Sequence, residues 1–538
     1  MDVRLRDFAA PRMLERLMRG TRTFRRPFRA ALMLTPVALA AAAAVGLSAV
    51  PATAAAQKPN VVMVVTDDQR LDEFDKRTMP ATKKLIADQG TTFTEAIIPT
   101  PTCCPSRASI ITGQYGHNNG VLANAPGYRA LENPGSTLPV WLQEAGYQTA
   151  HLGKYLNGYQ GVADPNTEVA PGWDQWHTLL PPRQYYGYNL AVNGKKRKYG
   201  DKDPDYLTRV LNRRTTHLIR RFARKPDPFY IQLDQFAPHT ESGISSGKVR
   251  CKGGTVPDPR DEKRFRNVKL PGRPNFNEKD VSDKPSFIRV RDRLDATGKR
   301  KVTKRSGCRR ASLRAVDRGV EKIVRTLDKE GELNRTVIIF VSDNGYFLGE
   351  HRISVNKTFP YEEALRVPLA MRVPQGVVGG SRPAKVKKLV ANIDLAPTIL
   401  ELAGGEPCTS GECRVMDGHS LVGLLKGNGG GIPNNRSLVL EYGRKRDKDG
   451  LLCEYAGIRD PARVYVEFTG LASDGGCREI DEGEFYDLRR DPFQLANLFV
   501  PNRGASTQAD LGAKLDELRD CAGIAGRDPQ PLEGSYCE

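Results

Sequence analysis

Two uninterrupted apolar segments constrain the fold of this chain more than any other feature. Residues 60–66 read NVVMVVT and residues 336–341 read TVIIFV, and both runs are rich in β-branched side chains. Such runs form strands that are buried on both faces, as in a parallel sheet covered by helices. Polar residues follow directly. Asp67 and Asp68 come after the first run, and Ser342, Asp343 and Asn344 come after the second. The sequence therefore predicts two core strands with acidic side chains at their carboxyl ends.

Shorter apolar runs alternate with helical patterns along the rest of the chain. Residues 149–152 and 229–233 are expected to be strands, and the polar residues Lys154 and His239 follow them. Helices are expected where apolar residues recur every three or four positions. These segments are 79–89, 138–145, 206–222, 312–327 and 393–402. Alternating strands and helices build an open α/β sheet that binds ligands beyond the carboxyl ends of its strands, so the polar clusters should meet at one edge.

Length and composition suit one large domain with a smaller companion. The chain has 538 residues, of which 39% are hydrophobic and 27% charged, with 51 Gly and 37 Pro. This composition excludes collagen, coiled coils, disordered chains and polytopic membrane proteins. We expect a main domain over residues 57–436, and a small α+β domain over 437–538 with its clearest strand at 464–468 and an acidic tail.

Residues 241–310, the basic segment, carry 21 Lys and Arg against 9 Asp and Glu without clear periodicity, and we expect a long insertion beside the site.

Residues 1–56 have the composition of an export signal. Nine arginines lie in this segment, an Ala- and Leu-rich run covers 30–50, and Ala54, Ala55 and Ala56 fit the small-residue cleavage rule. The Arg25-Arg26 pair resembles a twin-arginine signal, although Phe24 precedes it where Ser or Thr is usual. An uncleaved membrane anchor is the alternative, because the run is long enough to cross a bilayer, whereas no later stretch is. We expect an exported protein that is secreted, periplasmic or associated with the cell wall.

Cysteine usage agrees with export. Eight of the ten cysteines follow residue 250, and an oxidising compartment allows these to pair. Pairing of neighbours gives Cys251 with Cys308, Cys408 with Cys413, Cys453 with Cys477 and Cys521 with Cys537, one of many connectivities that eight cysteines allow. Cys103 and Cys104 stand apart from the others, and a disulfide between adjacent residues is strained. These two cysteines need another explanation.

The residues after the two core strands suggest a divalent metal ion. Asp67, Asp68 and Asp343 offer carboxylates and Asn344 offers an amide oxygen. Calcium and magnesium prefer such hard donors, whereas zinc prefers His or Cys. Each pair alone has a simpler interpretation, because two acids after a strand are commonly a turn or a helix cap. Two such pairs at the ends of two core strands favour the metal.

The segment around Cys103 combines a thiol, an arginine and a helix start. Cys103 lies four residues before Arg107, Pro105 restricts the turn between them, and a helix is expected to begin at Ser106. A helix N-terminus favours an anion. These residue types suit a thiolate nucleophile or a soft metal ligand at Cys103, with Arg107 holding the thiolate or an anionic substrate. A packed, half-buried pair of cysteines is the alternative.

The same segment is similar to the first signature of the sulfatase family. Cys103, Pro105, Ser106 and Arg107, followed by an apolar pair and Thr-Gly, match that signature, and residues 146–154 (GYQTAHLGK) resemble the second. Similar segments follow in the family's order at 342–346, 361–368, 392–398 and 485–492. The resemblance covers residues 59–498.

This resemblance implies an alkaline-phosphatase-like fold, α/β with a large mixed, mostly parallel sheet flanked by helices. It also implies that a formylglycine-generating enzyme converts Cys103 to formylglycine, whose hydrated aldehyde supplies the nucleophile that attacks sulfur. The metal implied is calcium. Its implied ligands are Asp67, Asp68, Asp343, Asn344 and residue 103.

The other site residues that the resemblance implies are cationic or aromatic. Arg107 orients the hydrate, Lys154 and Lys357 bind the sulfate, and His239 contacts the sulfate or protonates the leaving oxygen. His351 and His117 are secondary candidates. The alternative for each lysine, taken alone, is a solvated surface residue, and the alternative for His239 is a residue that caps a strand. Only their positions within the family motifs favour the functional interpretation.

Departures from the family pattern point to a subgroup. Leu156 stands where many arylsulfatases have a histidine, two residues after Lys154. The run 154–157 (KYLN), the adjacent Cys103 and Cys104, and segments 171–176 and 185–189 resemble the branch of N-acetylglucosamine-6-sulfatases and extracellular heparan endosulfatases. Residues 347–351 (FLGEH) instead resemble bacterial arylsulfatases.

Together these features predict a calcium-dependent sulfuric ester hydrolase that acts on a sulfated glycan or a sulfated small molecule such as an aryl sulfate. The basic segment favours an anionic polysaccharide, with a solvated loop as the alternative. No nucleic-acid partner is expected, because basic and aromatic residues are not interleaved in any motif. Two other functions stay open: a phosphonate or phosphate ester hydrolase that uses the same modified cysteine, and a catalytically silent relative that binds sulfated glycans.

Overall fold

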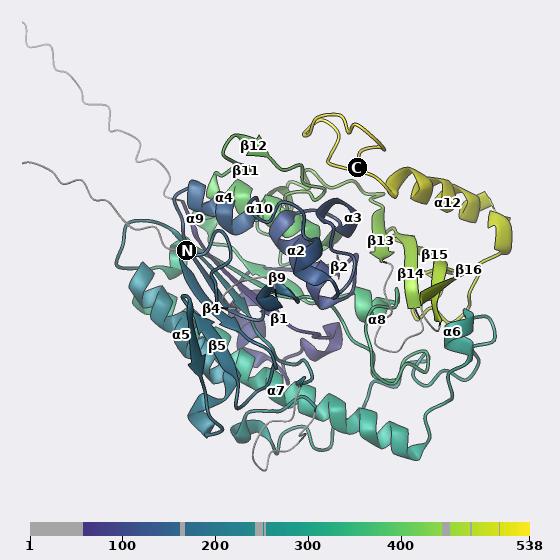
Figure 1. Ribbon diagram of the computed structural model, residues 1–538, viewed down its shortest axis with the longest axis horizontal. Coiled ribbons are helices and arrows are strands. Elements are labelled where there is room, and N and C mark those ends of the chain that lie inside the picture. The colour runs from purple at the N-terminus through teal and green to yellow at the C-terminus, as the bar shows by residue number, and fades with distance from the viewer. Residues whose placement is uncertain are drawn as a thin grey trace, which may run out of the picture. The chain divides into compact units, whose positions relative to one another are not determined.

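The first apolar segment is strand β1, in the middle of a ten-stranded sheet (Figure 1). The computed structural model describes residues 58–161, 167–242, 251, 254–443, 452–473, 476–504 and 506–538. The strands of this sheet are β1 (Asn60–Thr66), β2 (Thr91–Ile97), β3 (Gln148–Gly153), β4 (Gln175–Leu179), β5 (Asn189–Val192), β6 (Lys195–Lys198), β7 (Phe229–Asp234), β8 (Thr336–Ser342), β9 (Leu369–Arg372) and β10 (Lys385–Ala391). Their order is β10-β2-β9-β8-β1-β7-β3-β4-β5-β6.

The centre of the sheet is parallel and its flanks are mixed. Strands β8, β1, β7, β3 and β4 pair in parallel, with Val61 of β1 opposite Val337 of β8. Strands β9, β5 and β6 pair antiparallel with their neighbours. The predicted mixed, mostly parallel sheet is therefore confirmed. Because β8, β1, β7 and β3 run in one direction, the polar residues that follow them lie at one edge.

Helices cover both faces of the sheet, as the uninterrupted apolar runs require (Figure 1). The larger helices are α2 (Cys103–Thr112), α4 (Leu138–Glu144), α5 (Leu207–Phe222), α7 (Ala296–Lys329) and α10 (Leu395–Ala403). Val61, Met63 and Val65 of β1 share one apolar core with α2, α4 and α10. Val62 and Val64 point to the other face and share a second core with α5 and α7. The alternation follows from the two-residue period of a strand.

The remaining helices are short, except for one near the carboxyl terminus. They are α1 (Pro80–Thr82), α3 (Gly116–Asn119), α6 (Ser286–Arg289), α8 (Glu362–Leu365), α9 (Gln375–Val378), α11 (Val422–Lys426) and α12 (Ser506–Leu518). The helices predicted at 138–145, 206–222 and 393–402 are confirmed as α4, α5 and α10. The helix predicted at 79–89 is shorter and divided, because α1 passes into a π-helical turn at Lys83–Ala87.

The basic segment is more regular than its sequence suggested. Residues 296–310 form the first half of helix α7, so the helix predicted at 312–327 begins much earlier. Asp295 caps it by accepting a hydrogen bond from the Gly298 amide at 2.6 Å. Lysines and arginines fill most of this half of the helix, and among them Val302 is buried. With so few apolar positions, the helical period is hard to see in the sequence.

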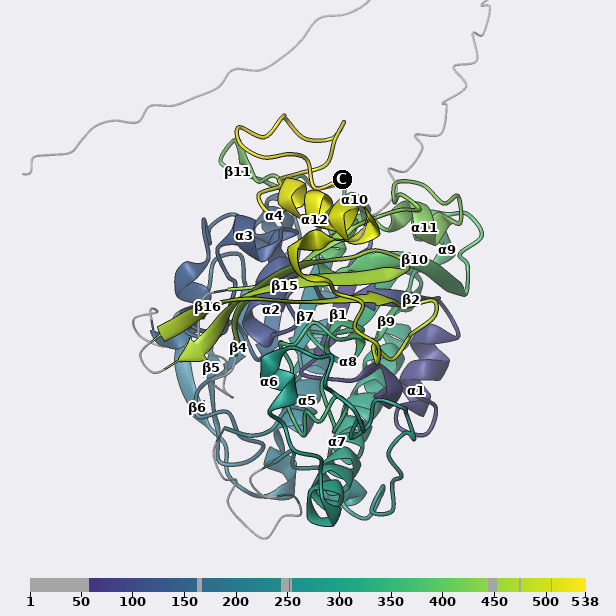
Figure 2. The same cartoon turned by 90° about the vertical axis from the view of Figure 1, so that its right-hand side faces the viewer.

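A separate antiparallel sheet follows, as predicted for the carboxyl-terminal region (Figure 2). Its strands are β13 (Leu438–Tyr442), β14 (Leu452–Arg459), β15 (Arg463–Ser473) and β16 (Gly476–Asp487). The predicted strand at 464–468 lies within β15, and helix α12 packs against β14 and β15. A two-stranded hairpin, β11 (Cys408–Thr409) and β12 (Glu412–Cys413), precedes this sheet.

Three of the predicted disulfides are present: Cys251 with Cys308, Cys408 with Cys413, and Cys521 with Cys537. Cys103 and Cys104 are free and buried. The predicted export signal, and the side chains of the predicted pair Cys453 and Cys477, lie outside the described residues. None of the helices in the described ranges combines the length and apolar composition that a membrane crossing needs.

Candidate functional site

The two acidic pairs predicted from the sequence meet at the carboxyl ends of β1 and β8. The Asp68 amide donates a hydrogen bond to Asp343 Oδ1 at 2.9 Å. Asn344 Nδ2 donates to Asp68 Oδ1 at 2.8 Å. Asp67 and Asp343 are fully buried, and the Asp68 backbone has a φ of 69°, in the left-handed region that most residues avoid. Three carboxyl groups are thus held together away from water.

Helix α2 brings Cys103 to the acidic pairs. The helix begins at Cys103 rather than at Ser106, because a proline in the first turn lacks only an amide that would have no partner there. The Cys103 thiol donates to Asp67 Oδ1 at 3.3 Å, and Lys357 Nζ donates to Cys103 Sγ at 2.6 Å. Burial and the charge of Asp67 raise the pKa of Cys103 to about 12. Near neutral pH the unmodified side chain is therefore a thiol and not a thiolate.

Each carboxylate of the cluster faces a cation. Lys154 Nζ lies 2.5 Å from Asp67 Oδ2, and Lys357 Nζ pairs with Asp68 Oδ1. Arg107 Nη2 lies 2.9 Å from Asp343 Oδ2. We call these six residues together with Cys103, His239 and Asn344 the rim cluster.

A glycine places Lys154 at the end of β3. Gly153 has a φ of 103°, and a Cβ there would lie 1.8 Å from the Asp234 carbonyl oxygen. The close approach lets the Lys154 amide donate to that carbonyl at 3.0 Å. A larger residue at 153 would push the two strand ends apart and displace the lysine.

Asp234 is a site residue that the sequence reasoning missed. Its Oδ1 lies 3.1 Å from Arg107 Nη1, and its Oδ2 lies 2.8 Å from His151 Nε2. Asp234 and Arg107 are both almost fully buried. Asp234 ends strand β7, and an acid at the end of a core strand is the same signal that identified Asp67 and Asp343. Arg107 therefore lies between two carboxylates, Asp343 and Asp234, that fix its orientation.

His239 lies on the solvent side of the rim cluster. Its Nε2 is 3.6 Å from Asp68 Oδ2, and its side chain is 17% exposed against 10% for Lys357 and 3% for Lys154. Its Nδ1 lies 2.5 Å from the Thr240 carbonyl oxygen, so Nδ1 carries the proton and Nε2 faces Asp68. Burial lowers the pKa of His239 to about 3, which makes the ring neutral. A ligand can reach the cluster past His239 and Lys357.

The carboxylates of the rim cluster titrate differently because their neighbours differ. Although burial raises the pKa of Asp68, Lys357 and His239 lower it to about 2. Burial and Asp67 raise the pKa of Asp343 to about 6. Lys357 has its pKa raised well above the usual value, because Asp68 outweighs the effect of burial. The two carboxyl groups thus differ because Lys357 outweighs the effect of burial at Asp68, whereas Arg107 and Lys154 do not outweigh it at Asp343.

The donor atoms of the rim cluster fit a divalent cation. One ligand atom each of Asp67, Asp68, Cys103 and His239 lie within 4.8 Å of one another. Asn344 Oδ1 is buried and has no hydrogen-bond partner. A buried carbonyl oxygen without a donor is costly unless a cation or water binds it. Carboxylate and amide oxygens are the ligands that calcium prefers.

The two secondary histidines do not join this cluster. His351 is fully buried, with Nδ1 2.8 Å from Glu278 Oε2 and Nε2 3.1 Å from Asn275 Nδ2. His117 Nδ1 lies 2.8 Å from Glu441 Oε2, and its Nε2 lies 3.0 Å from the Cys521 carbonyl oxygen. Both rings are held by partners outside the cluster, so their positions support structural roles.

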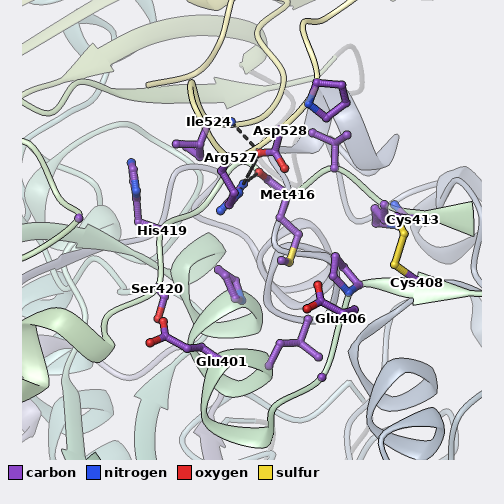
Figure 3. Close-up of a pocket in the computed structure, with 18 of the residues that line it drawn as sticks. Glu401, Glu406, Cys408, Cys413, Met416, His419, Ser420, Ile524, Arg527 and Asp528 are labelled. Carbon is purple, nitrogen blue, oxygen red and sulfur yellow. Dashed lines mark hydrogen bonds and ion pairs between the residues drawn. A yellow bond between two sulfur atoms is a disulfide. The ribbon is translucent and has the colours of Figure 1, made fainter.

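A hollow lies away from the rim cluster, between helix α10, the β11–β12 hairpin and the carboxyl-terminal segment (Figure 3). This hollow, the C-terminal cavity, has a volume of about 750 Å³. Two ion pairs lie at this cavity: Arg527 Nη2 is 2.6 Å from Asp528 Oδ2, and His419 Nε2 is 3.0 Å from Glu538 Oε2. Glu401 and Glu406, which also line it, are exposed to solvent. No residue of the rim cluster lines it.

Comparison with known proteins assigns the chain to a family. The sulfatase family profile matches residues 59–405, and the profile described as N-sulphoglucosamine sulphohydrolase, C-terminal, matches residues 349–521. The human N-acetylglucosamine-6-sulfatase is 34% identical over 90% of this chain and 88% of its own length.

Solved structures share the fold. A protein solved in complex with its substrate D-glucosamine-2-N,6-O-disulfate is 25% identical, with a TM-score of 0.69 over 86% of this chain and 97% of that one. The phosphonate monoester hydrolase of Agrobacterium radiobacter is 19% identical, with a TM-score of 0.65 over 89% of this chain and 99% of that one, a likeness of fold alone.

Proposed function

Because the chain belongs to the sulfatase family and is a sulfuric ester hydrolase, we propose that the rim cluster is its active site, working with formylglycine made from Cys103 and with a calcium ion. The observation that carries this proposal is the convergence of Cys103 with Asp67 and Lys357 at the carboxyl end of β1. This convergence brings the segment that matches the first sulfatase signature to the acidic pairs that follow the core strands.

The cations of the rim cluster suit a sulfate monoester. Its cleavage places negative charge on the sulfuryl oxygens and on the leaving oxygen. Lys357 and Lys154 bind the sulfuryl oxygens, and His239 lies on the solvent side with Nε2 toward the cluster. With a proton on Nε2, as the bound anion favours, His239 contacts the sulfate or gives that proton to the leaving oxygen. Arg107 is held by Asp343 and Asp234, so it orients the side chain at position 103.

Formylglycine supplies a hydrated aldehyde, and so gives position 103 a nucleophilic hydroxyl group that a protonated thiol lacks. The burial of Cys103 in the first turn of α2 supports this conversion, because a thiol with a pKa of about 12 is a poor nucleophile near neutral pH. Conversion by a formylglycine-generating enzyme takes place on the unfolded chain or before α2 is buried, since Cys103 is 1% exposed in the folded protein.

Calcium would be held by Asp67, Asp68, Asp343 and Asn344 together with the residue at 103. When bound, the ion polarises a sulfuryl oxygen and offsets the charge of the three carboxylates. The partnerless Asn344 Oδ1 and the raised pKa of Asp343 support this assignment.

The substrate that we propose is a glucosamine unit sulfated at O6, in a glycan or as a free sugar. The similarity to N-acetylglucosamine-6-sulfatase over most of both chains supports it, as does the related complex with a glucosamine disulfate.

An exported location is supported by the three disulfides, which persist in oxidising compartments.

The proposal is tested by comparing turnover of N-acetylglucosamine 6-sulfate and of the 4-nitrophenyl esters of sulfate, phosphate and phosphonate. We expect the highest kcat/KM with a sulfate ester, and a loss on the order of 10⁴-fold or more in Cys103→Ala. The matched control is Cys104→Ala, which removes the neighbouring thiol of α2. Preference for the phosphonate ester would favour the phosphonate hydrolase, and binding of sulfated sugars without turnover would favour a silent relative.

A further inference from the structure

Arg183 is a basic residue beside the rim cluster that lacks the partners its neighbours have. It lies in the loop between β4 and β5 and is half-buried. Its Nε is buried without a hydrogen-bond partner. Within the described part of the chain, no carboxylate forms an ion pair with its guanidinium. By contrast, Arg107 pairs with Asp343 and Asp234.

Hydrogen bonds tie the Arg183 loop to the loop that carries His239. The Ser242 amide donates to the Arg183 carbonyl oxygen at 2.9 Å, and the Tyr185 hydroxyl donates to the His239 carbonyl oxygen at 2.7 Å. His239 is the most exposed side chain among the ion pairs of the rim cluster. The backbone of Arg183 is therefore held next to the loop from whose side a ligand reaches the cluster.

The Arg183 guanidinium interacts electrostatically with residues of the rim cluster, but no carboxylate there forms an ion pair with it. Burial lowers the pKa of Arg183, and Arg107 lowers it too, although Asp67 and Cys103 raise it. A guanidinium that is partly removed from water without an anionic partner is unfavourable. An oxyanion of the substrate would supply that partner, because sulfate and carboxylate groups match the two-pronged geometry of arginine.

We propose that Arg183 binds a second acidic group of the substrate, a sulfate or carboxylate other than the sulfate ester that is cleaved. The cations Lys154, Lys357 and Arg107 and the ring of His239 already lie near position 103, so the scissile group has its cations without Arg183. The inference rests on the proposed function, since it takes the rim cluster as the place of cleavage. Arg183 then selects doubly charged sugars over singly charged ones.

The experiment compares three sugars with the full chain carrying Cys103→Ala, which prevents turnover. These are N-acetylglucosamine 6-sulfate, D-glucosamine-2-N,6-O-disulfate, and a disaccharide that joins a uronic acid to N-acetylglucosamine 6-sulfate. Isothermal titration calorimetry gives the Kd of each with and without Arg183→Gln. We expect this substitution to weaken binding of at least one doubly charged sugar about 10- to 100-fold, with less than about threefold change for the singly charged one.

The pattern of losses decides the outcome. A selective loss with the disulfate places the second anion on the same sugar, and a selective loss with the uronate places it on the neighbour. Equal losses with all three sugars would overturn the proposal, because Arg183 would then contact the scissile sulfate. No loss with any sugar would overturn it too.

Two further variants separate binding from charge and folding. Arg183→Lys keeps the charge but not the forked geometry, and should recover part of the lost affinity. Arg197→Gln removes an exposed arginine from β6 and should leave all three Kd values unchanged. Thermal melting shows whether Arg183→Gln is folded. Failure of the proposed function is seen separately, as a lack of sulfate ester turnover by the unaltered chain.

Discussion

The rim cluster and the C-terminal cavity differ in how deeply their charged and polar groups are buried, and this difference distinguishes a reactive site from a hollow in the fold. In the cavity, Arg527 pairs with Asp528 near the surface, and the carboxylates of Glu401 and Glu406 are exposed to solvent (Figure 3). In the rim cluster, Asp67, Asp68 and Asp343 are packed together in the protein interior, and Asn344 Oδ1 has no partner. Burying charged groups, even in pairs, and leaving a buried oxygen without a donor are both costly, and such arrangements persist where a ligand or ion offsets the cost.

Removal of calcium should separate the two regions most strongly. With a chelator we expect activity to fall about 10³-fold and the melting temperature to drop, because the three carboxylates lose their counter-ion. Readdition of calcium should restore both. The matched pair is Asp68→Asn, which should abolish the calcium-dependent shift in melting temperature, and Asp528→Asn in the cavity, which should leave it intact. A calcium response that is the same in both variants would contradict the assignment.

Loss of a single cation from the rim cluster comes next. Lys357→Met should lower kcat/KM for a sulfate ester about 10²- to 10³-fold, the usual effect of removing one donor from developing charge. Its control is Lys426→Met in α11, near the cavity, for which we expect less than a twofold change. Steady-state kinetics with both purified variants would decide, and equal effects would break the contrast between the two regions.

Asp234→Asn tests how firmly Arg107 must be held. The amide keeps the size of the side chain but removes the Asp234 carboxylate, one of those that orient the guanidinium. We expect about a tenfold fall in kcat with little change in KM, because a charge-assisted hydrogen bond to a positioning residue is lost. An unchanged kcat would show that Asp343 and Asp67 hold Arg107 sufficiently without Asp234.

The smallest effect is expected far from the chemistry, at His117. Although burial lowers the pKa of His117, Glu441 raises it to about 9. The pair therefore stabilises the fold fully below about pH 6.5, and this contribution is lost as the pH rises through about 9. The difference in free energy of unfolding between the wild type and His117→Asn should shrink by about 2 kcal/mol over that range. Denaturant titrations at several pH values measure it, and a growing difference would contradict the charge state.

Much of the centre of the fold could be predicted, because uninterrupted runs such as 336–341 have one physical explanation. Asp67, Asp68, Asp343 and Asn344 were found because they end such runs. The order of the strands could not be predicted, since β1 and β8 are 269 residues apart and nothing local records that they are neighbours. The first half of α7 was missed because lysines and arginines hide its period.

Site residues were harder to predict where their role depends on contacts made in the folded chain. Asp234 and Arg183 belong to no signature. The role of Asp234 follows from its ion pair with Arg107, and that of Arg183 from the lack of a carboxylate partner among the described residues. His117 was placed among the candidates by its position in the sequence, but the fold turns it toward Glu441. Such residues become visible only when the loops after β4, β7 and α2 are seen together.

The central claim is that the thiol of Cys103 is replaced by a hydrated aldehyde in the working enzyme. Mass spectrometry of the peptide that contains residue 103, taken from protein with measured sulfate ester turnover, tests it directly. The account predicts a peptide in which the sulfur of Cys103 is replaced by oxygen, in a fraction that rises and falls with specific activity. Full activity in protein whose Cys103 carries an intact thiol would contradict it.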